Sequence, residues 1–206
     1  MTEFISTHGV WLVAGFIALE SIGGPLPAEA FLIAAAIFAA STHELDIGLL
    51  IVVGVIAAIA GNVAGFWLGR TFGHQLLTTY GRRVGLTAGR IKIGQWLFLH
   101  YGGVFVFAAR FLPFLRNMAA LLAGANRMAQ HSFYFASSIA AVAWVMTYGF
   151  GAYAFGEAFK RSASPAVVLA GLVAVAIIVA IPTIISRYEK RLLAKAEREL
   201  PDNPPT

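Results

Sequence analysis

Long uncharged apolar runs alternate with short polar breaks along this chain. Three of the runs reach the roughly 20 residues that a helix needs to cross a bilayer. We predict spanning helices there, over residues 47–72, 131–156 and 163–186. The other apolar segments are shorter and are interrupted by charge, glycine or proline. The pattern indicates an all-α polytopic membrane protein.

Two further stretches are apolar on both sides of a polar break. The break within residues 9–42 contains Glu20, Gly23, Gly24, Pro25, Pro27 and Glu29. The break within residues 93–126 contains Arg110, Pro113 and Arg116. Proline removes a backbone donor and clashes with the preceding turn, and broken backbone at membrane depth must be buried in protein or face water. Each stretch therefore predicts a re-entrant hairpin, with Pro25, Pro27 and Pro113 at the breaks; for the second, the alternative is one spanning helix with snorkelling arginines.

The chain shows the pattern of an internal repeat, because each interrupted stretch is followed by a long spanning helix. Aligning Pro27 with Pro113 also brings Gly65 onto Gly151. Paired apolar segments interrupted by glycine and proline in two halves of a chain indicate a transporter site at the interface between the halves. We therefore predict an inverted repeat in which the two hairpins are oppositely oriented.

The composition supports a membrane protein and narrows its chemistry. Of the 206 residues, 59% are hydrophobic and 12% are charged, and the mean hydropathy is +0.76. These values lie outside the range of ordinary soluble proteins. The basic residues cluster beside apolar segments, so the net charge of +5 indicates membrane topology rather than nucleic-acid binding. The chain contains no cysteine, which excludes disulfides and thiolate chemistry.

Most basic residues lie in a loop over residues 73–92 and in a tail over residues 187–200. The positive-inside rule places both segments on the cytoplasmic side. They share a side only if the second interrupted stretch re-enters rather than spans, so the charges favour the hairpin. We predict a single membrane domain over residues 1–200, ending in a basic helix over 187–200 with a cytoplasmic C-terminus, and a disordered tail over 201–206.

Four ionisable residues lie within the interrupted stretches: Glu20, Glu29, Arg110 and Arg116. Such a residue costs about 2.5 kcal/mol or more at the bilayer centre, so it marks a functional site and needs a partner. If the two breaks face each other, the four groups converge on one buried site. Burial disfavours a charged glutamate whereas a neighbouring guanidinium favours it, which suits a proton-coupled step, and the arginines suit a phosphate or another anionic head group.

The alternative is a purely structural role, in which the four residues form static ion pairs that hold the two hairpins together. His74, His100 and His131 lack the spacing of metal ligands, so we expect neither a metal nor a cofactor. We find no hydrolytic motif and therefore do not expect an enzyme.

Three motifs occur together in the chain. They are Glu20 ahead of P-L-P-A-E at 25–29, G-N-V-A-G-F-W-L-G-R-T-F-G at 61–73, and A-R-F-L-P-F-L-R at 109–116. Together they resemble the DedA family of membrane proteins, also called the VTT or SNARE-associated domain family, over about residues 15–150. The sequence departs from the family pattern at Ala28, where many members have glycine, and at Ala120, where many have proline after the second arginine.

The resemblance implies two opposed re-entrant hairpins, with Glu20, Glu29, Arg110 and Arg116 as the functional set. It also implies a role in bacterial membrane lipid homeostasis, since some members return undecaprenyl phosphate across the cytoplasmic membrane with the proton motive force and eukaryotic relatives are lipid scramblases. We therefore expect an inner-membrane flippase for an anionic phospholipid or undecaprenyl phosphate. Its partners would be the phosphate-bearing lipid and protons, and the sequence also permits a homo-oligomer.

Two other functions fit the same residues. A proton-coupled antiporter of small ions or cationic drugs would depend on Glu29 more than on the arginines. A non-transporting membrane scaffold in lipid homeostasis would need the charges for folding rather than for rate.

Overall fold

The computed structural model describes residues 2–24, 26–79, 88–110 and 113–162, together with 169, 171 and 173. Throughout these ranges the regular structure is helical. The helices are α1 (Thr2–Ile22), α2 (Ala28–Thr42), α3 (Ile47–Thr79), α4 (Ala88–Ala109), α5 (Pro113–Ala125), α6 (Gln130–Val145) and α7 (Gly151–Arg161). A π-helical turn, η2 (Met146–Phe150), joins α6 to α7.

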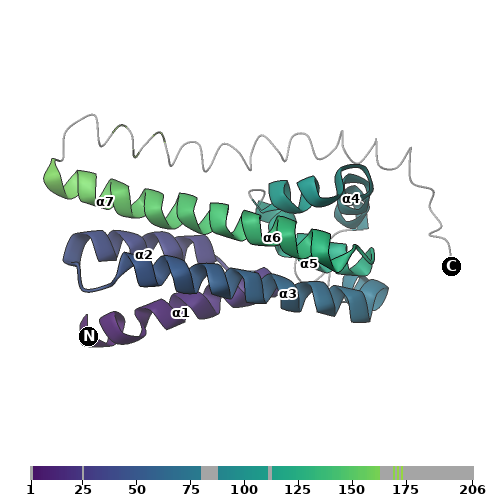
Figure 1. The fold of residues 1–206 in the computed structure, drawn as a ribbon, viewed down its shortest axis with the longest axis horizontal. Helices are drawn as coiled ribbons and strands as arrows, with labels where there is room; N and C mark the ends of the chain where they lie inside the picture. The colour runs from purple at the N-terminus through teal and green to yellow at the C-terminus, as the bar shows by residue number, and fades with distance from the viewer. Residues whose placement is uncertain are drawn as a thin grey trace.

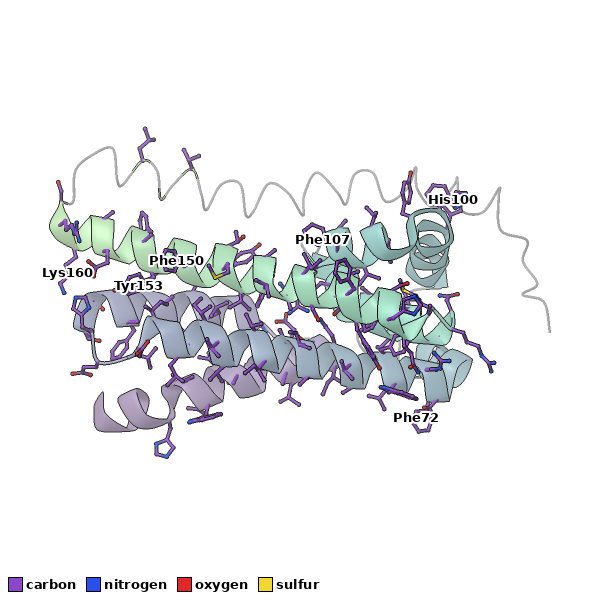
Figure 2. All side chains as sticks on the ribbon, viewed as in Figure 1. Phe72, His100, Phe107, Phe150, Tyr153 and Lys160 are labelled. Carbon is purple, nitrogen blue, oxygen red and sulfur yellow. The ribbon has the colours of Figure 1, made fainter. Side chains whose placement is uncertain are left out.

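Two long helical segments run side by side along the molecule (Figure 1). One is α3, and the other is α6 continued through η2 into α7. The helices α1 and α2 lie at the end that holds the N-terminus, whereas α4 and α5 lie at the opposite end (Figure 1). Lys160, near the end of α7, and Phe72, on α3, mark these two ends (Figure 2). The fold therefore consists of two helical hairpins that enter from opposite ends of a pair of long helices.

Both hairpins turn where the sequence places its breaks. Gly23 has a φ of 128°, which only glycine adopts readily, and α2 begins directly after Pro27. In the second hairpin Arg110 follows the last residue of α4, and α5 begins on Pro113. Proline is favoured at the first position of a helix because its missing N–H has no partner to lose there. The proline in the second break therefore starts a helix; Pro25 lies outside the described residues.

Two described segments, Ile47–Phe72 and Gln130–Arg161, are long and apolar enough to cross a membrane. Both coincide with predicted spans, and the all-helical class of a membrane protein is confirmed. The second segment continues five residues beyond the predicted end at residue 156. Apart from residues 169, 171 and 173, the predictions for residues 163–186, 187–200 and 201–206 lie outside the described residues.

The two helices that flank the predicted basic loop extend into residues 73–92. Helix α3 continues to Thr79, and α4 begins at Ala88. The backbone continues its own hydrogen bonds past the apolar segment, so the end of the membrane span does not set the end of the helix. Helix α4 also contains a kink that the sequence pattern did not predict, since Gly102 has φ 49° and ψ −121°.

Glycines on α3 allow the two hairpins to approach it closely. A Cβ added at Gly61 would overlap the backbone of α1 at Ala18, and one at Gly69 would overlap the backbone of α5 at Leu121. Gly65 lies between them and contacts both helices. Its predicted counterpart Gly151 has nothing within 4 Å of its Cβ position, so this pair does not share an environment.

The two larger of the three apolar cores in the described part of the chain are separated by buried polar residues. The first contains side chains of α1, α2, α3 and α6, including Ile17 and Leu32, and the second contains Phe66 and Phe133 from α3 and α6. Along both long helices a buried polar residue lies between the cores, Asn62 on α3 and Ser137 on α6. The polar residues occupy the level at which the two hairpins end.

Candidate functional site

The four predicted site residues all lie beside the two hairpin turns. Glu20 is in the last turn of α1, and Glu29 is in the first turn of α2. Arg110 follows α4, and Arg116 is in the first turn of α5. The helices thus present acidic groups from one hairpin and basic groups from the other.

Arg116 contacts both glutamates. Its Nη2 pairs with Oε1 of Glu20, and its Nη1 pairs with Oε1 of Glu29. The side chains of Arg116 and Glu20 are 12% and 6% exposed, and that of Glu29 is 24% exposed. A guanidinium presents several donors in one plane and can therefore hold two carboxylates at once. One cation of the second hairpin thus joins both halves of the first.

Arg110 has a different environment, although the sequence placed it in the same set. The residue is 8% exposed, and its guanidinium donates to Oδ1 of Asn62 at 2.9 Å and to Oγ of Ser21 at 3.5 Å. Asn62 in turn donates to Oγ of Ser137 at 2.8 Å. No carboxylate in the described part of the chain lies within ion-pair distance of Arg110. Of the four predicted residues, three are in direct contact, and the fourth is held by neutral partners.

Sequence reasoning missed Ser21, Asn62 and Ser137 because it considered only ionisable residues. All three are at least nine-tenths buried. A signal was nevertheless present, since an asparagine inside the apolar helix Ile47–Phe72 needs a hydrogen-bond partner there. The serines carried little signal, because a serine can satisfy its hydroxyl on the backbone of its own helix.

Trp144, on α6, is also part of the site. The centre of its ring lies 5.1 Å from Cζ of Arg110 and 5.8 Å from Cζ of Arg116. The face of an indole attracts cations, so the ring stabilises two like charges that share one buried region. The ring itself is 2% exposed, and its Nε1 has no hydrogen-bond partner in the described structure.

The site lies near the middle of the apolar spans. Asn62 is about 22 Å along α3 from Ile47 at the helical rise of 1.5 Å per residue, and the span ends at Phe72. The N-terminus of α5 lies at the same level and disfavours the positive charge of Arg116 in its first turn. The two glutamates offset that repulsion, and an anion at this position would be favoured by the helix.

Two small pockets adjoin the arginines. Arg110 and Arg116 line both of them; Asn62 and Ser137 line the first, and Glu20, Ser21 and Trp144 line the second. Each has room for about one water molecule. A phosphate group is larger and does not fit into either pocket in this arrangement of the helices.

Comparison with known sequences decides the family. The sequence model of the VTT domain matches residues 26–154, which is more than half of the chain and contains Glu29, Arg110 and Arg116. The chain belongs to the VTT domain family. Glu20 and Ser21 lie just outside the matched residues. The predicted DedA resemblance is therefore confirmed at the level of the family.

Relatives of this VTT domain protein match it over most of its length. Protein DedA of Escherichia coli K12 is 28% identical over 205 residues, covering 96% of this chain and 92% of that protein. A Mycobacterium tuberculosis H37Rv protein described as an uncharacterized membrane protein is 34% identical over 178 residues, covering 80% of this chain and 81% of that protein. An uncharacterized membrane protein of Mycobacterium leprae is 32% identical over 200 residues, covering 91% of this chain and 89% of that protein. No solved structure matches the chain.

Proposed function

We propose that this VTT domain protein transports a phosphate-bearing lipid between the leaflets of the bacterial inner membrane, and that it is not an enzyme. The observation that carries the proposal is Arg110, a buried guanidinium whose described partners are neutral, beside Arg116, a second guanidinium held by two carboxylates. Two fixed cations at mid-membrane attract an anion. By family resemblance the lipid is an anionic phospholipid or undecaprenyl phosphate.

The membrane placement follows from where the hairpins end. We propose that both hairpins are re-entrant, because their turns lie beside Asn62 and Trp144, near the middle of the two spans. We also propose that they are halves of an inverted repeat. In support, each long helix packs against the second hairpin helix of the other half: α3 lies along α5, and α7 lies along α2. The C-terminus would then be cytoplasmic, as its charge pattern predicts.

Transport would be coupled to protons by protonation of the glutamates that pair with Arg116. A proton taken up by Glu20 or Glu29 removes one negative partner of Arg116 and weakens the tie between the hairpins. The guanidinium of Arg116 can then turn to a phosphate held by Arg110, and loss of the proton restores the ion pairs and expels the lipid. A ligand shifts the equilibrium between two conformations by the difference in its affinity for them. Here the proton is that ligand, because it binds the glutamates more tightly in the conformation in which their ion pairs with Arg116 are broken.

The alternatives fit the site less well. A cationic drug or small cation would approach two guanidinium groups, only one of which has carboxylate partners in the described structure. A scaffold has no need of Arg110 beside Arg116, because one arginine already joins the two hairpins through both glutamates. The geometry therefore favours an anionic ligand over a cationic one, and a binding site over a purely structural contact between the hairpins.

Transport in proteoliposomes tests the proposal. We expect Arg110→Ala, Arg116→Ala and Glu29→Gln to abolish the flipping of a fluorescent lipid phosphate, and we expect collapse of the proton gradient to slow the native protein. Arg161→Ala is the matched control, because it removes a guanidinium from a side chain that is 83% exposed. Full flipping by the three folded site variants would refute the mechanism.

A further inference from the structure

The indole N–H of Trp144 is a buried donor that the proposed transport mechanism does not yet use. The side chain is 2% exposed, and Nε1 lacks an acceptor in the described structure. Buried polar groups are nearly always hydrogen-bonded, so a donor left without a partner calls for an explanation. Trp67, on α3, is half exposed and still has an acceptor, since its Nε1 donates to the hydroxyl of Tyr134 at 3.1 Å.

The surroundings of this donor are those of an anion site. Trp144 lines one pocket together with Glu20, Ser21, Arg110 and Arg116. The face of the ring lies 5.1 Å from Cζ of Arg110 and 5.8 Å from Cζ of Arg116, so both cations are held by the negative face of the indole. The edge of an indole carries the opposite partial charge, and its N–H can only donate. Two arginines, the indole of Trp144 and the carboxylate of Glu20 thus line the same small space.

We propose that Trp144 is a ligand-binding residue whose Nε1–H donates to an oxygen of the bound phosphate group, alongside Arg110 and Arg116. The inference rests on the proposed function, because it assigns a third donor to the same head-group site. In the closed arrangement of the structure, the pocket has room for about one water molecule. A phosphate that enters as the hairpins separate would reach the N–H as it reaches the two arginines.

A nuclear magnetic resonance titration reports directly on this hydrogen bond. The full chain contains four tryptophans, Trp11, Trp67, Trp96 and Trp144, so labelling tryptophan with ¹⁵N gives four indole signals in detergent micelles. Loss of one signal in Trp144→Phe assigns it. We expect n-dodecyl phosphate to move the Trp144 signal downfield, while dodecyltrimethylammonium does not. The signal of Trp67 is the internal control, because its N–H already has an acceptor.

A matched pair of variants separates binding from folding. Trp144→Phe keeps an aromatic face over both guanidinium groups and removes the N–H together with the rest of the five-membered ring. We expect the Kd for n-dodecyl phosphate and the transport KM to rise about tenfold with kcat nearly unchanged, because one hydrogen bond to a charged acceptor is lost. The smaller ring leaves a cavity, and the loss of an unsatisfied buried donor offsets part of its cost, so we expect the variant to stay folded in detergent. Trp67→Phe should leave the Kd unchanged.

The outcomes distinguish this inference from the proposed function. If n-dodecyl phosphate raises the thermal midpoint of the native protein but leaves the Trp144 signal and the Kd of Trp144→Phe unchanged, the inference is wrong and the transport proposal stands. If the native protein does not bind n-dodecyl phosphate at all, both are wrong. If inorganic phosphate moves the signal as far as the lipid analogue does, the donor role is supported, and the ligand is free phosphate rather than a lipid head group.

Discussion

The two arginines differ because of their partners and not because of their charge. Arg116 holds two carboxylates, whereas Arg110 is held by Asn62 and Ser21. Removing one partner of a buried ion pair leaves an uncompensated charge, while a neutral partner can be exchanged at lower cost. The two positions should therefore respond differently to substitution.

Loss of Arg116 should destabilise the fold strongly. In Arg116→Ala the carboxylates of Glu20 and Glu29 lose their shared counter-charge within the membrane. We expect the free energy of unfolding to fall by about 3–5 kcal/mol, measured by denaturant titration in mixed micelles. Arg161→Ala, at an exposed pair with Glu157, should change it by less than about 0.5 kcal/mol. Equal effects for the two variants would contradict the ion-pair assignment.

A substitution at Asn62 tests whether Arg110 needs uncharged partners in order to bind an anion. In Asn62→Asp a carboxylate oxygen replaces the amide oxygen that lies 2.9 Å from Nη1 of Arg110. We expect the variant to fold with a thermal midpoint at least equal to that of the native protein, because the buried cation gains a counter-charge. Binding of n-dodecyl phosphate, measured by calorimetry, should weaken by about tenfold or more, since the guanidinium is already neutralised. Retained affinity would show that Arg110 does not bind the head group.

At the scale of the helices, the close approach of α3 to α1 and α5 fixes the positions of the hairpins. It depends on glycines whose missing Cβ atoms leave room for the backbone of another helix. Substitution at such a position forces two helices apart, whereas the same substitution where nothing lies nearby changes only helix propensity.

Gly69→Ala and Gly15→Ala form a matched pair. A Cβ at Gly69 would overlap the carbonyl of Leu121 on α5, whereas one at Gly15 on α1 would meet nothing within 4 Å. We expect Gly69→Ala to lower the free energy of unfolding by about 1–3 kcal/mol, and Gly15→Ala to raise it by up to about 1 kcal/mol. Thermal melting in detergent compares the two. A destabilised Gly15→Ala beside a tolerated Gly69→Ala would contradict the contact.

The breaks and the pairing of opposite charges could be predicted from the sequence, because proline, glycine and buried charge each have a local physical cost. The neutral partners of Arg110 could not, since Ser21 on α1 and Asn62 on α3 reach its guanidinium only when these helices are packed together. The kink at Gly102 also escaped prediction, because a single glycine is compatible with a straight helix. The division of roles between Arg110 and Arg116 depends on distances that a linear pattern does not contain.

At the scale of the whole molecule, two hairpins from opposite ends meet beside two long helices (Figure 1). The pockets at the meeting point are too small for a phosphate group. The proposed transport of a phosphate-bearing lipid therefore requires the hairpins to move relative to the long helices, and a covalent link between the two should prevent it.

A disulfide can test this motion, because the chain has no cysteine of its own. A Cβ at Gly103 on α4 would lie 3.7 Å from Cβ of Ala136 on α6, within the range of a disulfide. We expect Gly103→Cys with Ala136→Cys to lose lipid flipping on mild oxidation and to recover it on reduction, in proteoliposomes. Each single variant under the same oxidant is the control. Full activity of the linked protein would mean that α4 and α6 move together.

The arrangement in which α3 lies along α5, and α7 along α2, has a consequence for biogenesis. The ribosome releases α1, α2 and α3 first, yet the surface of α3 at Gly69 is covered by Leu121 of α5, which is made 52 residues later. The nascent N-terminal half must wait in the bilayer with that surface turned to lipid or to an insertion chaperone. Truncated products should consequently be recognised by membrane quality-control proteases, whereas the completed chain escapes them.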